Sequence, residues 1–199
     1  MSAATRAGYA ALLGRPNVGK STLLNRLIGQ KLSITAPKPQ TTRHVILGIR
    51  TAPDAQIVYV DTPGMHRQTR RAMNRYLNRA AASVLNYVDV AVFLIEALRW
   101  VEEDDEALAR LADFPGPVVL AVNKVDRVAD KTRLLPFLRE SAGKRDFAEV
   151  VPVAALGGDN VAALERAIIG LLPAGDLLFP EDQITTASER FLVAELIRE

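Results

Sequence analysis

The 199-residue sequence contains no cysteine, which excludes disulfide bonds and thiolate metal sites and fits a reducing cytoplasm. It has no apolar run close to the ~20 residues that a membrane-spanning helix needs. Residues 1–8 lack the long apolar core of a signal peptide. Hydrophobic residues make up 49% and charged residues 24% of the chain, which is typical of a soluble globular protein. The length suits one ordinary domain with a tail.

The most informative segment that is present, residues 14–21, reads Gly14-Arg15-Pro16-Asn17-Val18-Gly19-Lys20-Ser21. This is the pattern G-x-x-x-x-G-K-S, in which glycines let the backbone curl so that its N–H groups point at phosphate oxygens. The lysine reaches the β- and γ-phosphates, and the serine hydroxyl binds Mg²⁺. Residues 9–13 predict a buried strand and residues 21–28 an amphipathic helix, whose N-terminus adds partial positive charge. The segment therefore predicts a phosphate-binding loop.

A second motif, Asp61-Thr62-Pro63-Gly64, follows the apolar run 57–60. An acidic residue at the tip of such a strand can hold Mg²⁺ through water, and the backbone N–H of Gly64 can reach a γ-phosphate.

A third motif, Asn123-Lys124-Val125-Asp126, follows the apolar run 118–122. The Asp126 carboxylate only accepts hydrogen bonds, so it matches the N1–H and the 2-amino group of guanine, which adenine does not offer as a pair of donors. Asn123 either bonds the other edge of the base or ties loops together, and the Lys124 stem can lie over the ring. The three motifs together predict a site for GTP or GDP.

These motifs are similar to those of translation-factor-class GTPases, and three further stretches narrow the resemblance to the Era family. Residues 40–44 (QTTRH) resemble its first switch, and residues 59–66 (YVDTPGMH) resemble its second. Residues 179–185 (FPEDQIT), followed by 188–191 (SERF), resemble the joint between its GTPase domain and its RNA-binding KH domain. The resemblance runs from about residue 8 to the end of the chain.

The resemblance implies a set of site residues. Thr42 corresponds to the switch threonine that contacts Mg²⁺ and the γ-phosphate, unless it is an ordinary loop threonine. The expected catalytic residues are Lys20, Thr42 and Gly64, and the expected Mg²⁺ ligands are Ser21, Thr42 and Asp61. The expected nucleotide-binding residues are Asn17, Val18, Gly19, Lys20, Ser21, Thr22, Asp61, Gly64, Asn123, Lys124, Asp126, Ala154, Ala155 and Leu156.

One departure from the family concerns the loop that supports guanine. This loop usually reads Ser-Ala, whereas here residues 152–155 read Pro-Val-Ala-Ala, so a serine hydroxyl is missing. The backbone N–H of Ala155 can still bond guanine O6, because a backbone donor does not depend on the side chain. We therefore expect altered affinity rather than altered base identity.

Hydrolysis has to proceed without the glutamine that orients water in many GTPases, because Met65 occupies that position. The resemblance agrees, since the Era group carries an apolar residue there. We expect slow intrinsic turnover, on the scale of unassisted GTPases. Positioning and charge must then suffice, with an extra cation supplied by a partner's arginine or by K⁺. Asn17 matches the asparagine that ligates K⁺ in related GTPases; the alternative is an asparagine that closes its own turn. We assign no catalytic role to His44 or His66.

Acidic residues are scarce in the first half of the chain. Residues 1–88 contain two acidic and 13 basic residues, a net charge of +11, whereas residues 89–199 have a net charge of −9. The clearest surplus is a stripe spaced by four, formed by Arg67, Arg71, Arg75 and Arg79. One hypothesis is a nucleotide-gated contact with ribosomal RNA or another acidic partner. The alternative is a solvated helix face that pairs with acids of the second half.

Strand and helix patterns alternate, which predicts an α/β fold with a six-stranded, mostly parallel sheet covered by helices on both faces. Strands are expected near 8–13, 45–51, 56–61, 88–95, 117–123 and 149–153. Helices are expected near 20–29, 70–86, 102–112, 131–142 and 160–172. Residues 51–55 are too few for a crossover helix, so the second and third strands should be antiparallel. Residues 31–43 read as a mobile first switch.

We assign residues 1–173 to a GTP-binding G domain and residues 174–199 to a linker and the first helix of a truncated KH domain. By the resemblance, the partners are the small ribosomal subunit and its RNA, reached mainly through the KH domain. We expect a cytoplasmic monomer, with peripheral association at the inner face of the cell membrane as an open alternative.

The favoured function is a GTP-hydrolysing switch in small-subunit assembly and ribosomal RNA maturation. One alternative is a guanine-nucleotide-binding interaction module with little hydrolysis, which Met65 suggests. Another is a tRNA-modification-type GTPase, which shares the loop asparagine and the Thr41-Thr42-Arg43 element. The stretch 179–185 argues against it, and Asn123 to Asp126 argue against an ATPase.

Overall fold

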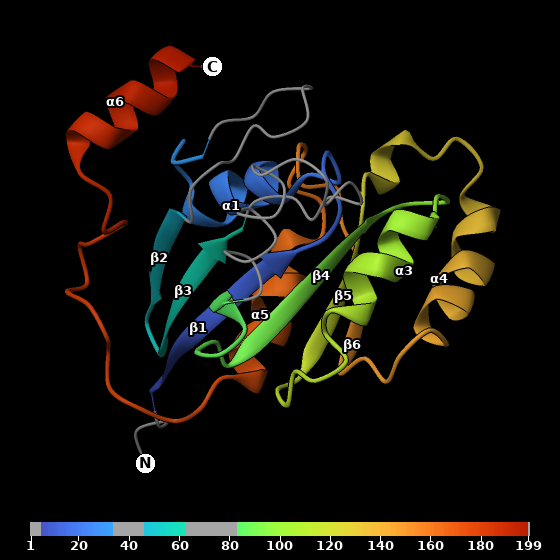
Figure 1. Ribbon diagram of the computed structural model, residues 1–199, viewed down its shortest axis with the longest axis horizontal. Helices are drawn as coiled ribbons and strands as arrows, with labels where there is room; N and C mark the ends of the chain where they lie inside the picture. Colours follow the sequence, from blue (N-terminus) through green and yellow to red (C-terminus); the bar gives the residue numbers. More distant parts are fainter. Residues whose placement is uncertain (1–4, 34–45, 63–82, 199) are drawn as a thin grey trace.

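The computed structural model describes residues 5–33, 46–62 and 83–198. Within these ranges the chain forms a six-stranded sheet with the order β2-β3-β1-β4-β5-β6 (Figure 1). The strands are β1 (Arg6–Leu13), β2 (Ile46–Ala52), β3 (Ala55–Asp61), β4 (Val90–Glu96), β5 (Val118–Asn123) and β6 (Glu149–Pro152). Neighbouring strands are parallel except β2 and β3, which are antiparallel. The predicted fold class and the predicted hairpin are confirmed.

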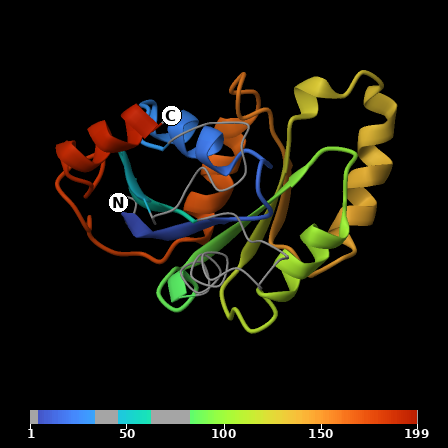
Figure 2. The same ribbon diagram turned by 45° about the horizontal axis from the view of Figure 1, so that its top comes forward.

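Helices cover both faces of this sheet (Figures 1 and 2). They are α1 (Lys20–Ile28), α3 (Glu102–Ala109), α4 (Leu134–Ala142), α5 (Val161–Leu171) and α6 (Glu189–Arg198), with 3₁₀ turns at Val125–Arg127 and Lys131–Arg133. Apolar side chains of α1 and α5 join one buried cluster, and those of α3 and α4 join or pack against the other. The helix predicted near 70–86 and the first switch at 31–43 lie largely outside the described residues.

The central strands are apolar on both faces because each face is covered. In β1 the side chains alternate: Ala10 and Leu12 enter the cluster of α1 and α5, whereas Ala11 and Leu13 enter the opposite one. This period of two places residues 10–13 in the core and carries the loop after Leu13 to the edge of the sheet.

The segment that follows α5 runs along the outer side of the hairpin. The backbone N–H of Ile49 in β2 donates to Ile184 O at 2.8 Å, and the Thr185 hydroxyl donates to Leu47 O at 2.6 Å. Gln56, which is fully buried in β3, accepts from the backbone N–H groups of Leu178 and Phe179. The predicted joint at 179–185 is therefore bonded to the sheet.

Helix α6 lies beyond β2 (Figures 1 and 2). Its Phe191 and Leu192 are half-buried against the cluster of α1 and α5, whereas Val193 and Ile197 are exposed. Among the described residues, no helix combines the length and the apolar character needed to cross a membrane.

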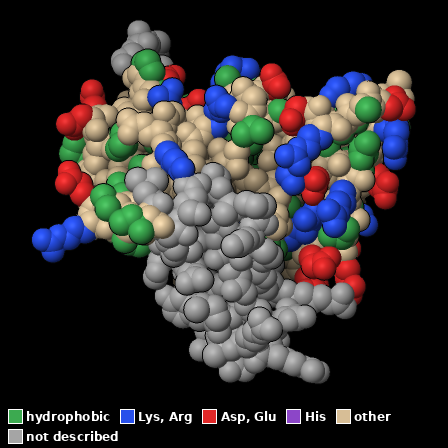
Figure 3. Space-filling model, turned by 90° about the horizontal axis from the view of Figure 1, so that it is seen from above, with side chains coloured by type: hydrophobic (Ala, Val, Ile, Leu, Met, Phe, Trp, Pro, Cys, Tyr) green, Lys and Arg blue, Asp and Glu red, His purple; other side chains and the backbone are tan. Residues whose placement is uncertain are grey.

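The carboxyl ends of the parallel strands meet at one edge of the sheet, and the strand order reverses at β1, between β3 and β4. Open α/β sheets bind ligands at such a switch point. Figure 3 looks onto this side of the molecule, where Lys and Arg side chains are scattered over the described surface and gather toward the right of the view, mixed with Asp and Glu.

Candidate functional site

The loop between β1 and α1 depends on two glycines. Gly14 has φ 142°, and a Cβ there would lie 2.4 Å from Leu94 O. Gly19 has φ 105°, and a Cβ there would lie 2.3 Å from Asn123 Nδ2. The approach to a backbone oxygen excludes a side chain at Gly14, and φ values above 100° strain any residue but glycine at both positions. The sequence pattern is thus required by the backbone path. Asn17, in the same loop, also has a positive φ of 63°.

Lys20 is buried inside this loop. Its amine donates to the carbonyl oxygens of Gly14 and Arg15, both at 2.9 Å. Burial lowers the pKa of Lys20 from its ordinary value to about 8, although the nearby Asp61 carboxylate opposes the shift. The loop therefore holds the Lys20 amine where the oxygens of a bound phosphate could replace its two carbonyl acceptors.

Ser21 and Asp61, two of the three residues predicted to bind Mg²⁺, lie side by side in the structure. The Ser21 hydroxyl, at the start of α1, donates to Asp61 Oδ2 at 2.9 Å, although the two residues are 40 positions apart. Asp61 is fully buried at the end of β3. A hydroxyl and a carboxylate are hard oxygen donors of the kind that Mg²⁺ prefers, so the donor set fits that ion.

The start of the predicted first switch is fixed to the same carboxylate. The Ser33 hydroxyl donates to Asp61 Oδ2 at 2.7 Å. Asn25 of α1 accepts from the backbone N–H groups of Leu32 and Ser33 and donates to Ser33 O. Sequence reasoning missed Asn25 and Ser33, because nothing in their spacing shows that they meet.

Asn123 connects the phosphate loop with the loop after β6. Its amide donates to Val18 O at 2.8 Å, and its Oδ1 accepts from the Ala155 N–H at 3.0 Å. It is 2% exposed. Of the two roles left open by the sequence, tying loops together is the one that these hydrogen bonds serve.

Lys124 and Asp126 follow directly. Lys124 has a positive φ of 65°, which is uncommon for a residue with a side chain and is found at functional sites. Asp126 lies exposed in a 3₁₀ turn. Its carboxylate has no hydrogen bond or ion pair with another described residue. It is therefore an open acceptor beside the loop that Asn123 holds.

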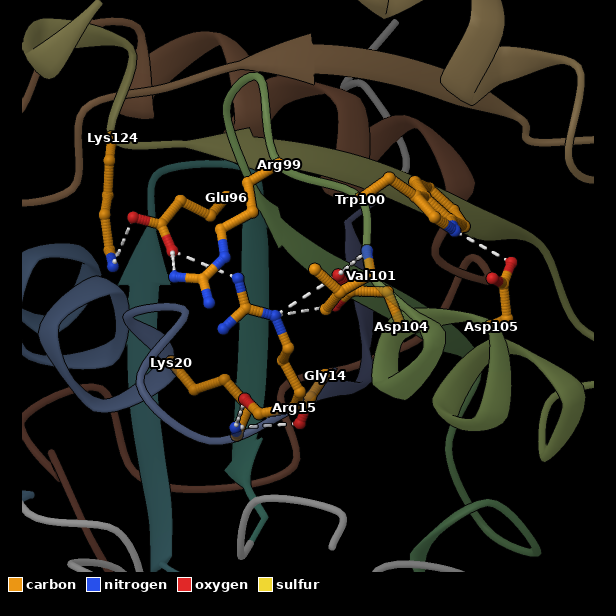
Figure 4. A network of polar contacts seen from close by, with 10 residues as sticks. All are labelled: Gly14, Arg15, Lys20, Glu96, Arg99, Trp100, Val101, Asp104, Asp105 and Lys124. Atoms are coloured by element: carbon orange, nitrogen blue, oxygen red, sulfur yellow. Dashed lines mark hydrogen bonds and ion pairs between the residues drawn. The ribbon is translucent and has the colours of Figure 1, made fainter. Parts of the chain in front are cut away.

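A charge network that the sequence did not reveal joins these loops (Figure 4). Arg15 donates to Glu96 at 3.0 Å and pairs with the fully buried Asp104 at 3.1 Å. Glu96, at the end of β4, also pairs with Lys124 at 3.1 Å. Its position at a strand end, like that of Asp61 and Asn123, was the available signal.

The network shifts two carboxyl groups in opposite directions. Burial raises the pKa of Asp104 above its ordinary value, although Arg15 opposes the shift. Partial burial acts in the same sense on Glu96, but hydrogen bonds from Arg15 and Lys124 outweigh it and hold the pKa of Glu96 below its ordinary value. Glu96 is therefore ionised while it joins the two cations.

The remaining site predictions divide into two groups. Ala154 and Ala155 are buried after β6, next to the exposed Leu156, and Thr22 lies in the first turn of α1. Thr42, Gly64, Met65 and the stripe of Arg67, Arg71, Arg75 and Arg79 lie outside the described residues.

A family model described as 50S ribosome-binding GTPase matches residues 9–124, which include the phosphate loop, Asp61, Asn123 and Lys124. The chain belongs to this GTPase family. It is 56% identical over 194 residues to GTPase Era of Azotobacter vinelandii and 54% identical over 196 residues to GTPase Era of Pseudomonas syringae pv. tomato. Both matches cover 98% of this chain, which spans 65% of the length of each relative.

Solved structures of Era are similar to this chain along almost its whole length. Era in complex with MgGDPNP and nucleotides 1506–1542 of 16S ribosomal RNA superposes with a TM-score of 0.93 at 39% identity. An Aquifex aeolicus Era variant bound to GDP·AlF4⁻ gives 0.90 at 38%. Each match covers 98% of this chain and 66% of the solved one. The G domain of FeoB from Methanococcus jannaschii, with a TM-score of 0.61 at 24% identity, shares the fold.

Proposed function

We propose that this chain is a GTP-binding and GTP-hydrolysing switch that acts in assembly of the small ribosomal subunit and maturation of its RNA. One observation carries the proposal: three motifs distant in sequence converge at one edge of the sheet. The Lys20 amine lies inside the phosphate loop, Ser21 lies 2.9 Å from Asp61, and Asn123 joins that loop to Ala155. Membership of the GTPase family and 56% identity to GTPase Era support it.

Each motif would then act on one part of the nucleotide. Lys20 exchanges its carbonyl acceptors for phosphate oxygens, and the amides of the phosphate loop donate to the same group. Ser21 and Asp61 would hold Mg²⁺, which supplies charge neutralisation between the β- and γ-phosphates when bound. Thr42 and Gly64 are assigned to the γ-phosphate by the resemblance alone.

Base selection is tested at Asp126, the open acceptor beside Asn123. Asp126→Asn replaces a double acceptor with an amide, so it should lose GDP and gain XDP, whose second carbonyl suits an amide donor. We expect the GDP-to-XDP ratio of affinities to fall by at least about 100-fold, because two hydrogen bonds to the base are exchanged. Asp113→Asn, an exposed aspartate after α3, is the matched control. Intact GDP binding by Asp126→Asn would refute the base assignment.

Hydrolysis is tested by single turnover of GTP in K⁺ and in Na⁺ buffer. Turnover should be slow. Because Asn17 would ligate K⁺ beside the phosphates, turnover should be faster in K⁺ than in Na⁺, and this difference should disappear in Asn17→Ala. An equal rate in both salts would exclude the K⁺ role. Binding without turnover in either salt would instead favour the interaction module.

The ribosomal partner is proposed from the relatives. The family description names the 50S subunit, whereas the structure of Era at 39% identity contains 16S ribosomal RNA, which favours the small subunit. We assign residues 1–173 to the G domain and residues 174–199 to the connection with a KH domain, which would make most RNA contacts in the longer protein. Cosedimentation with purified 30S and 50S subunits decides which of the two ribosomal subunits is the partner.

Further predictions from the sequence accompany this proposal. The stripe of Arg67, Arg71, Arg75 and Arg79 would contact ribosomal RNA, so reversing Arg71, Arg75 and Arg79 to Glu should weaken particle binding and leave GTP affinity intact. A cytoplasmic monomer remains the expected form. Peripheral membrane association and a tRNA-modification role remain alternative predictions.

A further inference from the structure

The loop of residues 154–158, hereafter the base loop, follows β6 and lies beside the candidate nucleotide site. Two backbone hydrogen bonds close it into a turn: Gly158 N donates to Ala154 O at 2.7 Å, and Ala154 N donates to Asp159 O at 3.0 Å. Ala154 and Ala155 are buried, but Leu156 is 66% exposed and Gly157 is also exposed. The second half of the base loop is therefore positioned by its backbone contacts rather than by apolar packing.

Arg26 of α1 binds carbonyl groups of the base loop, although it lies 129 positions before Ala155 in the sequence. Its Nε donates to Ala155 O at 3.2 Å, and its terminal amino group donates to Leu156 O. Its stem and guanidinium also lie over Gly158, where an added Cβ would meet Arg26 atoms at 3.6 Å. A charged donor that binds two consecutive carbonyls fixes the orientation of two consecutive peptides.

The orientation of these peptides determines where their N–H groups point. In a trans peptide the C=O and the following N–H point in opposite directions. Because Arg26 draws the Ala155 carbonyl toward α1, the Leu156 N–H points away from Arg26. The preceding donor, the Ala155 N–H, was the one that the sequence suggested for guanine O6, but in this structure it bonds Asn123 Oδ1 at 3.0 Å.

We infer that Arg26 is a positioning residue for base recognition: by holding the Ala155 and Leu156 carbonyls it presents the Leu156 N–H to O6 of guanine. The inference rests on the proposed guanine site and names its O6 donor. It also explains how a base loop with alanine at 154, and so without a side-chain hydroxyl there, keeps a defined shape. Arg26 itself does not touch the nucleotide.

The test compares GDP with 6-thio-GDP, which keeps N1–H and the 2-amino group but replaces O6 with sulfur, a weaker hydrogen-bond acceptor. Wild-type protein should prefer GDP. Arg26→Met keeps an unbranched apolar side chain but removes the donors, so GDP affinity should fall by about tenfold while 6-thio-GDP affinity changes much less. The ratio of the two affinities should therefore move toward one.

Arg139→Met on α4 is the matched control, since Arg139 is an exposed helical arginine in another part of the fold, and its ratio should equal that of the wild type. A ratio unchanged in Arg26→Met, whether both affinities fall equally or neither falls, overturns the inference. If wild-type protein does not prefer GDP to ADP, the proposed function itself fails. Thermal unfolding of each variant verifies that the compared proteins are folded.

Discussion

Proton uptake on nucleotide binding is the consequence of the structure that can be measured most directly. Burial lowers the pKa of Lys20 to about 8 in the nucleotide-free protein. At pH 9 only about a tenth of the molecules then carry a charged Lys20, because each pH unit above the pKa reduces the charged fraction tenfold. Phosphates favour the charged amine, so binding of Mg²⁺–GDP should take up about 0.9 proton at pH 9 and about 0.1 at pH 7.

Affinity must follow the same linkage. It should be nearly constant below pH 7 and fall toward tenfold per pH unit above about pH 8, until the pKa of Lys20 in the complex is reached. Calorimetry at pH 9 in two buffers with different ionisation enthalpies counts the protons. The chain has six lysines, so titration of their ¹³Cε resonances can follow Lys20 alone. Its midpoint should lie near 8.

The control is Lys20→Arg, whose guanidinium stays charged throughout. It identifies the Lys20 resonance by its loss, and proton uptake that persists in this variant comes from groups other than Lys20, such as guanine, which also titrates in alkaline solution. A Cε midpoint of 10 or above in nucleotide-free protein would refute the reasoning. So would uptake below about 0.2 proton at pH 9, because a lysine that is already charged takes up none.

Three stability predictions follow from buried polar groups. Arg15→Met should lower the free energy of unfolding by about 3–5 kcal/mol in urea denaturation because it leaves the carboxylate of Asp104 buried, and adding Asp104→Leu should restore most of the loss. Tyr59→Phe should leave stability unchanged or raise it by about 1 kcal/mol, because the buried Tyr59 hydroxyl has no hydrogen-bond partner among the described residues; lower stability would reveal one. Gln56→Ala should speed proteolysis between residues 173 and 189, since each lost hydrogen bond weakens the docked segment by about 1 kcal/mol.

The edge of the sheet that carries the candidate site was predictable from sequence, because each motif follows an apolar run and the carboxyl ends of parallel strands share one edge. The roles of individual side chains were harder to predict from the sequence. Asn123 had two chemically reasonable partners, the base and the loops, and only the path of the chain shows that Val18 and Ala155 lie within its reach.

Contacts across long stretches of sequence leave no periodic signal. Arg26 meets the base loop and Gln56 meets Phe179 through backbone carbonyls, which every residue possesses, so the sequence of the acceptor segment carries no information about the donor. Asp104 reads as one of four acidic residues at the start of α3, yet it is fully buried against Arg15. Burial of that one carboxylate follows from packing rather than from composition.

The phosphate loop contains two cations, and their surroundings separate their roles. Arg15 is neutralised by Glu96 and Asp104, so little of its charge remains for a bound anion. Lys20 instead donates to two neutral carbonyls, and its pKa is lowered because burial outweighs the attraction of Asp61. A phosphate that replaces those carbonyls would bind an amine that is already buried in the folded protein. The free-energy cost of desolvating this amine is therefore part of folding and not of phosphate binding. Replacing Arg15 should therefore act mainly on stability, and replacing Lys20 mainly on nucleotide affinity.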